Sequence, residues 1–120
     1  MTSKFLILTL AFGGLAACAS TPPPTEAMTR AETSVEQADR AGARRYDPGT
    51  LDTSKDKMAA SRIASEKGDK PAAKQYAEQA ELDADLAAAT ARSADAKKAA
   101  DEVKAGTETL RAEIARQAAR

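Results

Sequence analysis

Residues 69–94 read DKPAAKQYAEQAELDADLAAATARSA, and this stretch predicts a helix with one face made of alanine. Asp69 is a suitable N-cap, and Pro71 fits the first helical turn. Alanine returns every three or four residues: Ala73, Ala77, Ala80, Ala84, Ala87, Ala91 and Ala94. That spacing lines one side of a helix, and small side chains allow a second helix to approach closely. We expect the helix to span residues 70–118, which is about 70 Å at about 1.5 Å per residue.

The same helix carries a second periodic pattern. In the first part of the helix, this pattern lies almost opposite the alanine face. It advances in steps of four and three through Leu82, Leu86, Ala89, Ser93, Ala96, Ala100, Val103, Thr107, Leu110 and Ile114. A heptad pattern kept for this length is typical of a coiled coil. Val103, Leu110 and Ile114 carry nearly all of the late apolar surface, so this part is either an interaction surface for another chain or a solvated helix. Because the pattern keeps its phase across Gly106, we expect a bend or soft point there rather than a break.

Two shorter helices are predicted before the long one, over about residues 26–41 and 48–67. The motif Thr29-x-x-Glu32 has the form of a capping box near the start of the first. Gly42 is a suitable stop for this helix. The dipeptide Asp47-Pro48 combines an N-cap with a proline in the first turn of the second helix.

The second helix has a predicted apolar side that contains Leu51, Met58, Ala59 and Ile63. We expect the first two helices to pack on the early part of the third, where alanine permits close contact. The predicted fold is all-α, a three-helix antiparallel arrangement with a long third helix of partly coiled-coil character.

Composition limits the classes of function. Hydrophobic residues make up 42% of the 120 residues but aromatic ones only 3%. Much of the apolar content is alanine, which buries little surface. Because burial contributes about 25 cal/mol per Å² of apolar surface, we expect a small hydrophobic core. The net charge is zero, and no basic excess attracts nucleic acid. The sequence has no histidine and one cysteine, so we expect no zinc site and no intramolecular disulfide. We expect no enzymatic activity and no cofactor.

Two polar groups are candidate binding sites. One is the acidic cluster of the long helix, Glu78, Glu81, Asp83 and Asp85. It is either a weak cation site or a solvated helix face, and the flanking lysines favour the solvated face. The other is Arg44 and Arg45 with Tyr46, which either contact phosphate or lipid headgroups or form a solvated turn with the ring on the core. We favour the turn, and we expect Tyr46 to pack near Tyr76.

The N-terminus has the organisation of an export signal. Met1–Lys4 carries one cation, and Phe5–Leu15 is an apolar run of eleven residues. Eleven residues span about 16 Å as a helix, whereas a bilayer core requires about 20 residues. We therefore expect residues 1–17 to be a cleaved signal peptide.

The signal ends in Leu15-Ala16-Ala17-Cys18, which resembles the lipobox of bacterial lipoproteins. The resemblance implies that signal peptidase recognises Leu15, Ala16 and Ala17 and cleaves before Cys18. It also implies diacylglycerol on the Cys18 sulfur and an acyl chain on its amine. The alternative is an ordinary export signal with an A-x-A-like cleavage site. Inner-membrane lipoproteins commonly carry aspartate at the position of Ala19, so the resemblance implies sorting to the outer membrane, with the polypeptide in the periplasm.

The residues after the lipobox predict a tether followed by one helical domain. Residues 18–25 contain Pro22-Pro23-Pro24, and consecutive prolines favour an extended, semi-rigid segment. Residues 26–120 then form the alanine-rich helical domain.

Within that domain, three motifs resemble a helical domain of unknown function found in small lipoproteins of Gram-negative bacteria. They are Ala41-Gly42-Ala43, Tyr46-Asp47-Pro48, and Gly68-Asp69 followed by repeated alanines. The resemblance covers about residues 26–95. In longer relatives this domain precedes an OmpA-like peptidoglycan-binding domain. That domain is not present in this sequence, so its binding activity is not implied here.

We therefore expect a lipid-anchored envelope protein with a structural or protein-interaction role. The alternative is an accessory or chaperone-like subunit that binds client segments, because the hairpin around Gly68-Asp69 resembles half of a tetratricopeptide repeat. Expected partners are the membrane through Cys18, and a second copy or another envelope protein, with no nucleic acid. The sequence ends in Ala118-Ala119-Arg120, without the terminal lysine of Braun-type lipoproteins, so any proximity to peptidoglycan is expected to be non-covalent.

Overall fold

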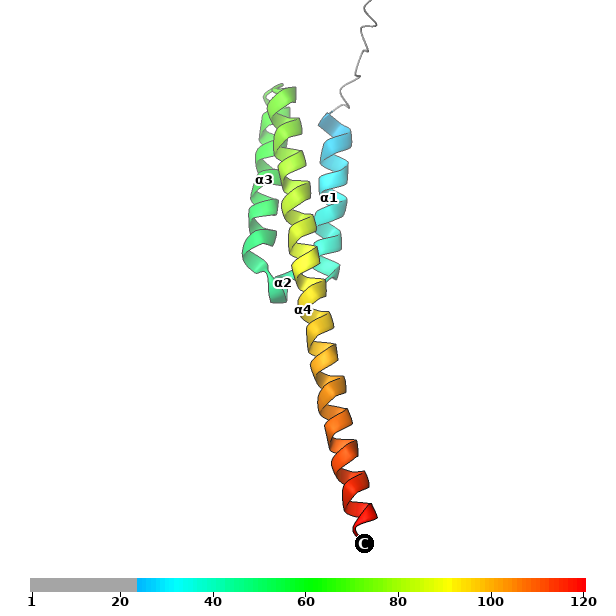
Figure 1. Ribbon diagram of the computed structural model, residues 1–120. Coiled ribbons are helices and arrows are strands. Elements are labelled where there is room, and N and C mark those ends of the chain that lie inside the picture. Colours follow the sequence, from blue (N-terminus) through cyan, green and yellow to red (C-terminus); the bar gives the residue numbers. More distant parts are fainter. Residues whose placement is uncertain (1–23) are drawn as a thin grey trace, which may run out of the picture.

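The computed structural model describes residues 24–120, which form helices α1 (Pro24–Arg40), α2 (Ala43–Tyr46), α3 (Pro48–Glu66) and α4 (Lys70–Ala118) (Figure 1). The described part contains no strand, which confirms the all-α prediction and the long last helix. The short helix α2 was not predicted, and it occupies the turn between the first two long helices. The predicted signal peptide, Cys18 and Ala19 lie outside the described residues.

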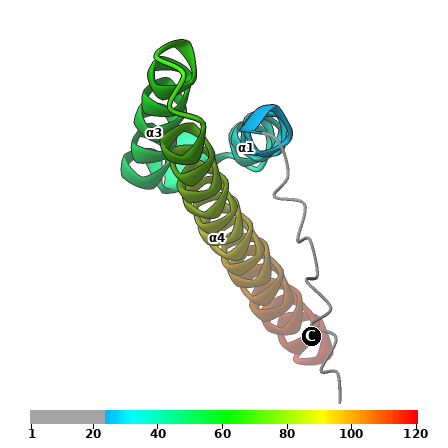
Figure 2. The same ribbon diagram turned by 90° about the horizontal axis from the view of Figure 1, so that it is seen from above.

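Consecutive long helices run antiparallel, so α1 and α4 point in the same direction with α3 opposed to both (Figure 1). Seen from above, α1 and α3 lie on either side of α4 (Figure 2). Both pack mainly on α4 and only slightly on each other. The first half of α4 is therefore the central element of the bundle.

The core consists mostly of alanine, as the alanine face of α4 predicts. Six residues of that face are buried, namely Ala73, Ala77, Ala80, Ala84, Ala87 and Ala91. The seventh, Ala94, is half-buried. Helix α1 meets this face with buried Ala27, Ala31, Ser34 and Ala38. Helix α3 meets it with Leu51, Ser54, Met58, Ser61 and Ala64. Leu51 and Met58 are the largest of these side chains, so the helices approach closely.

The predicted apolar side of α3 is partly wrong. Leu51 and Met58 are buried, but Ala59 is exposed and Ile63 is 51% exposed. Leu51 and Met58, seven positions apart, set the direction of the buried face, and Ile63 is five positions after Met58. At about 100° per residue, five residues place Ile63 about 140° away from that face. Ser61 takes the core position instead.

Two buried serines bind α3 to α4. The Oγ of Ser54 donates a hydrogen bond of 2.7 Å to the carbonyl oxygen of Ala80. The Oγ of Ser61 donates one of 2.7 Å to the carbonyl oxygen of Ala73. These bonds satisfy the buried hydroxyls, which would otherwise destabilise the core.

Helices α3 and α4 begin at the predicted caps. The Asp47 carboxylate accepts a 3.3 Å hydrogen bond from the N–H of Thr50. The Asp69 carboxylate accepts one of 3.1 Å from the N–H of Ala72. Gly68 precedes α4 with a φ of 79°, a left-handed conformation in which glycine is favoured.

Helix α1 includes residues that were assigned to the tether, and Thr29 does not cap it. The helix begins at Pro24, so Pro24 and Thr25 are helical instead of belonging to the extended tether. Thr29 is inside the helix, where its Oγ1 donates a 2.9 Å hydrogen bond to the carbonyl oxygen of Thr25. It therefore does not cap the helix. Proline has a suitable φ for the first helical turn, so Pro24 is compatible with helix.

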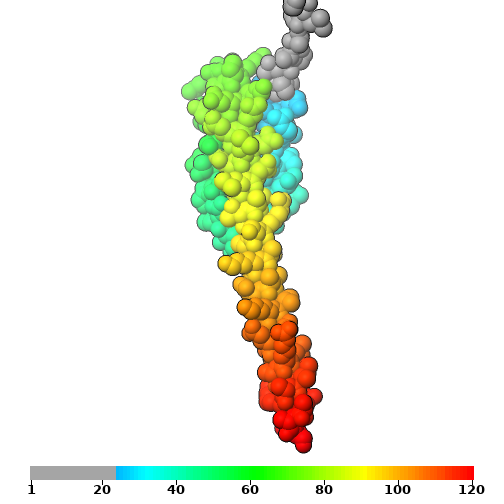
Figure 3. All heavy atoms as spheres, in the orientation of Figure 1, coloured from blue at the N-terminus to red at the C-terminus, as the bar shows by residue number. Residues whose placement is uncertain are grey.

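Helix α4 extends far beyond the bundle as a single helix. Every residue from Asp95 to Arg120 is exposed, and the orange-to-red part projects alone below the bundle (Figure 3). The segment from Asp95 to Ala118 is about 36 Å long at about 1.5 Å per residue. The helix continues through Gly106, so there is no break there, as expected. In residues 24–120, no helix is both long and apolar enough to cross a membrane.

Candidate interaction surface

The predicted interaction residues lie on the part of α4 that projects from the bundle. Val103, Leu110 and Ile114 are 70%, 66% and 65% exposed. Large apolar side chains are exposed here without a covering element from the described chain. They are therefore the strongest candidates for a binding surface.

The exposed apolar surface also extends back along the bundle. Leu82 is 69% exposed and Leu86 is 57% exposed, although this part of α4 packs against α1 and α3 on its other side. All ten heptad positions are exposed, and we call them the heptad stripe: Leu82, Leu86, Ala89, Ser93, Ala96, Ala100, Val103, Thr107, Leu110 and Ile114. The heptad stripe runs for about 48 Å along α4.

The angular positions of the two faces explain why the stripe remains exposed. Leu82 precedes buried Ala84 by two residues, which corresponds to about 200° around a helix. The alanine face therefore binds α1 and α3, while the leucine side chains point to the opposite side. The stripe plays no part in the bundle core.

A row of basic residues borders the distal part of the stripe. Lys97, Lys104 and Arg111 are seven residues apart and exposed, and we call them the basic row. Each directly follows a stripe residue. Within the described chain none of the three forms a salt bridge, whereas Lys98 lies 3.8 Å from Glu102 and Arg116 lies 3.0 Å from Glu113. The basic row was missed by the sequence analysis, although its seven-residue spacing beside a heptad pattern was a usable signal.

The other border of the distal stripe has small residues and one acid. Its positions precede Ala100, Thr107 and Ile114 by one residue, and they are Ala99, Gly106 and Glu113. A Cβ added at Gly106 would meet no atom within 4 Å. The distal surface is therefore asymmetric, with three cations on one border and, on the other, two small residues and Glu113, which pairs with Arg116.

The arginine pair at the turn has partners of its own. The Arg44 guanidinium donates two hydrogen bonds, of 2.8 and 2.9 Å, to the Asp39 carboxylate. These bonds, with Lys55 at 3.7 Å, lower the pKa of Asp39. Arg45 lies over the Tyr46 ring at 5.9 Å from its centroid. The arginines are therefore engaged within the turn, which agrees with the solvated-turn interpretation.

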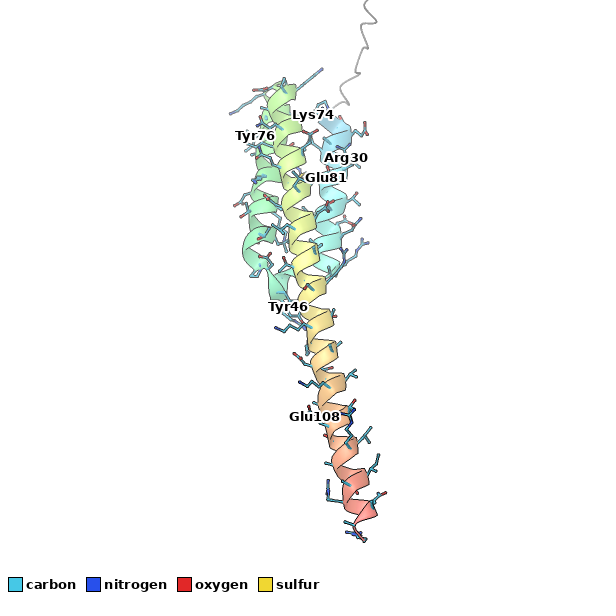
Figure 4. All side chains as sticks on the ribbon, in the orientation of Figure 1. Arg30, Tyr46, Lys74, Tyr76, Glu81 and Glu108 are labelled. Atoms are coloured by element: carbon cyan, nitrogen blue, oxygen red, sulfur yellow. The ribbon has the colours of Figure 1, made fainter. Side chains whose placement is uncertain are left out.

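Tyr46 and Tyr76 do not pack together, so this expectation was wrong. The labelled side chains lie at opposite ends of the bundle (Figure 4). The Tyr46 hydroxyl instead donates a 3.3 Å hydrogen bond to Asp95. A hollow of about 470 Å³ beside Tyr46 is lined by the arginines of the turn and by Asp95.

Three residues of the acidic cluster, Glu78, Glu81 and Asp83, pair with basic residues of the bundle. Glu81 lies 3.3 Å from Arg30 of α1, and the two side chains point toward one another (Figure 4). Asp83 pairs with Lys57. Within the described residues, no group of three or more acidic side chains could hold a metal ion. Glu81 and Asp83 therefore form half-buried ion pairs between helices, and this part of the cluster differs from the expected solvated helix face.

One comparison with known proteins gave a match. The family described as "Domain of unknown function (DUF4398)" matches residues 26–103, which is more than half of the chain. The chain belongs to the DUF4398 family. Neither a curated protein nor a solved structure matches it.

The DUF4398 match covers the whole bundle and the proximal part of the heptad stripe. It ends at residue 103, so Leu110 and Ile114 lie outside it. The DUF4398 match and the exposed surface therefore overlap from Leu82 to Val103.

Proposed function

We propose that this DUF4398 protein is a lipid-anchored, periplasmic lipoprotein of the Gram-negative outer membrane with a protein-interaction role in the cell envelope. The lipobox-like sequence that ends in Cys18 supports the anchor, and Ala19 after it supports outer-membrane sorting. Residues 1–17 are removed in this proposal. The helical domain follows after a short tether, because helix α1 already includes Pro24.

The observation that carries the interaction role is the placement of the heptad stripe relative to the start of α1. Pro24 lies at one end of the bundle, and the distal half of α4 projects from the other end (Figure 1). A lipid anchor at Cys18 is six residues from Pro24, so a tether this short holds the first end near the membrane. The distal stripe then points away from the lipid surface, toward other components of the periplasm.

A client-binding hairpin is a weaker explanation of the geometry. Such a hairpin requires an open concave face, and here α1 packs on α4 while α3 fills the facing side with Leu51 and Met58. The exposed apolar side chains lie on the outer surface of α4, not within the hairpin. The interaction surface is therefore convex and helical.

The anchor is tested by replacing Cys18 with alanine in a Gram-negative host. We expect the wild-type protein to incorporate labelled palmitate and to fractionate with the outer membrane, whereas Cys18→Ala remains an unprocessed precursor without label. Ala19→Asp should move the protein to the inner membrane, and Ser20→Ala serves as the matched control. A cleaved, soluble periplasmic product from Cys18→Ala would contradict lipid anchoring.

The interaction role is tested by site-specific photo-crosslinking in intact cells. Crosslinkers at Val103 and Leu110 should give discrete adducts, because both side chains are exposed on the heptad stripe. Ala112 is the control, since it is exposed on the other side of α4. Equal adduct patterns from the three positions would contradict a stripe-specific interaction.

A further inference from the structure

We propose that the heptad stripe binds a helix of a different protein, one whose own apolar heptad is bordered by carboxylates that face the basic row. This inference rests on the proposed interaction role and gives the partner a chemistry. It uses two features of the stripe, namely its charge borders and the sizes of its side chains.

The basic row lies where partner recognition occurs in a two-stranded coiled coil. Lys97 follows Ala96, Lys104 follows Val103, and Arg111 follows Leu110. Positions that border the apolar seam form the interhelical ion pairs that set partner choice and orientation. Because the described chain gives these three cations no salt-bridge partner, they are available to carboxylates from another helix.

A second copy in parallel orientation has unfavourable charges. Bordering residues five positions apart face each other across a parallel pair. Lys97 would face Arg92 of the other copy. Asp83 and Glu78 would also face each other, but both already pair with lysines of their own chain. Like charges in these positions disfavour pairing. No opposite charges meet at the remaining positions along the stripe.

A second copy in antiparallel orientation meets a similar obstacle. The register that pairs the large side chains places Leu82 opposite Ile114. In that register Lys97 meets its own copy near the centre, and Asp85 lies beside Glu113. One favourable pair forms between Asp83 and Arg111, but Asp83 already pairs with Lys57.

The small residues in the middle of the stripe also favour a different sequence in the partner. Ser93, Ala96 and Ala100 leave little apolar surface there. Two identical helices would place these small side chains near the middle of the contact and bury little area. A partner with leucine at these levels would fill the space and bury more apolar surface. Carboxylates beside those leucines would complete the match to the basic row.

The test measures binding of designed peptides to the purified protein in nonionic detergent. Two helical peptides share the same leucine heptads, and they carry either glutamate or lysine at the bordering positions. By fluorescence anisotropy we expect the glutamate peptide to bind about tenfold more tightly, since each of three exposed ion pairs contributes a factor of about two. Raising the salt concentration should reduce the difference.

Charge reversal supplies the decisive comparison. The triple variant Lys97→Glu, Lys104→Glu, Arg111→Glu should reverse the preference between the two peptides. A matched triple of exposed basic residues away from the stripe, Lys98→Glu, Arg116→Glu, Arg120→Glu, should leave it unchanged. Circular dichroism shows whether each variant retains its helical content.

Any of three results would overturn the proposal. The first is that the glutamate peptide does not bind. The second is that the matched triple changes the preference as much as the basic-row triple does. The third is that sedimentation shows a dimer formed through the stripe. The last result would assign the stripe to a second copy. Peptide binding does not require the lipid. A negative binding result would therefore contradict the inferred partner, whereas absence of palmitate labelling would contradict the lipid anchor alone.

Discussion

Ser61 and Ala73 join α3 to the first turn of α4 through the 2.7 Å hydrogen bond between the serine Oγ and the alanine carbonyl oxygen. Ser54 and Ala80 repeat this bond at the same length. The two serines are seven residues apart, and so are the two carbonyls, in the opposite direction. The pair of bonds therefore fixes the antiparallel register of α3 against α4.

We predict that Ser61→Ala lowers the free energy of unfolding by about 1 kcal/mol, the usual net value of one hydrogen bond. The loss stays modest because alanine leaves no unsatisfied hydroxyl behind. Urea denaturation followed by circular dichroism measures it. Ser65→Ala is the control, since Ser65 is exposed on the same helix. Equal stabilities of the two variants would contradict a structural role for the bond.

The alanine face of α4 has no space for larger side chains. Ala84 is fully buried between α1 and α3. We predict that Ala84→Leu destabilises the bundle by about 1–3 kcal/mol, because overpacking forces the helices apart. Ala112→Leu adds the same volume at an exposed position, and its unfolding midpoint should remain that of the wild type. A thermal or urea transition unchanged in Ala84→Leu would contradict close packing at this position.

Gly106 lowers the local stability of the projecting segment. Alanine is about 1 kcal/mol better than glycine inside a helix, and a Cβ at Gly106 has no neighbour within 4 Å. We predict that Gly106→Ala increases amide protection around residue 106 by about fivefold in hydrogen exchange. Ala105→Gly should have the opposite effect. Bundle amides should not respond in either variant, because every residue of the projecting segment is exposed. A matching change in the bundle would show that the two parts unfold together.

The Asp39–Arg44 pair should make stability depend on pH in the acidic range. The Arg44 hydrogen bonds, followed by the charge of Lys55, lower the pKa of Asp39 below its ordinary 3.8. The folded pKa lies below the unfolded one, so the stabilisation is complete above the unfolded pKa and disappears as pH falls through the folded pKa.

We therefore predict that Asp39→Asn is less stable than wild type at pH 7, and that the difference closes below about pH 4. Asp56→Asn is the control, since Asp56 is exposed and forms no salt bridge within residues 24–120. Urea denaturation at several pH values measures both variants. A difference that persists at pH 2 would contradict the assigned cause.

The features that were predicted correctly have strong local causes. Asp47 and Asp69 cap helices because their carboxylates reach nearby N–H groups, and proline follows both caps in the first turns. The alanine face was recognisable because it repeats over many turns. These signals depend on neighbouring residues and do not require knowledge of the tertiary contacts.

The features that were missed depend on tertiary contacts. Ser54 and Ser61 occupy core positions because close helices bring backbone carbonyls within reach of their hydroxyls, and serine gives no hydrophobic signal. Ile63 was misplaced because apolar character was given more weight than its angle from Met58. The spacing of the basic row was visible in the sequence. Its position beside an exposed apolar surface became clear only from the structure, in which the whole heptad stripe is exposed.

The alanine and serine core also affects how the bundle responds to temperature. The heat-capacity increment of unfolding rises with the apolar surface that is exposed and falls with the polar surface. Alanine methyl groups contribute little apolar area, and Ser54, Ser61 and their carbonyl partners contribute polar area. The stability curve of this bundle is therefore flatter than that of a leucine-rich bundle of equal length. Cooling removes less of its stability, and its folded range extends further toward low temperature.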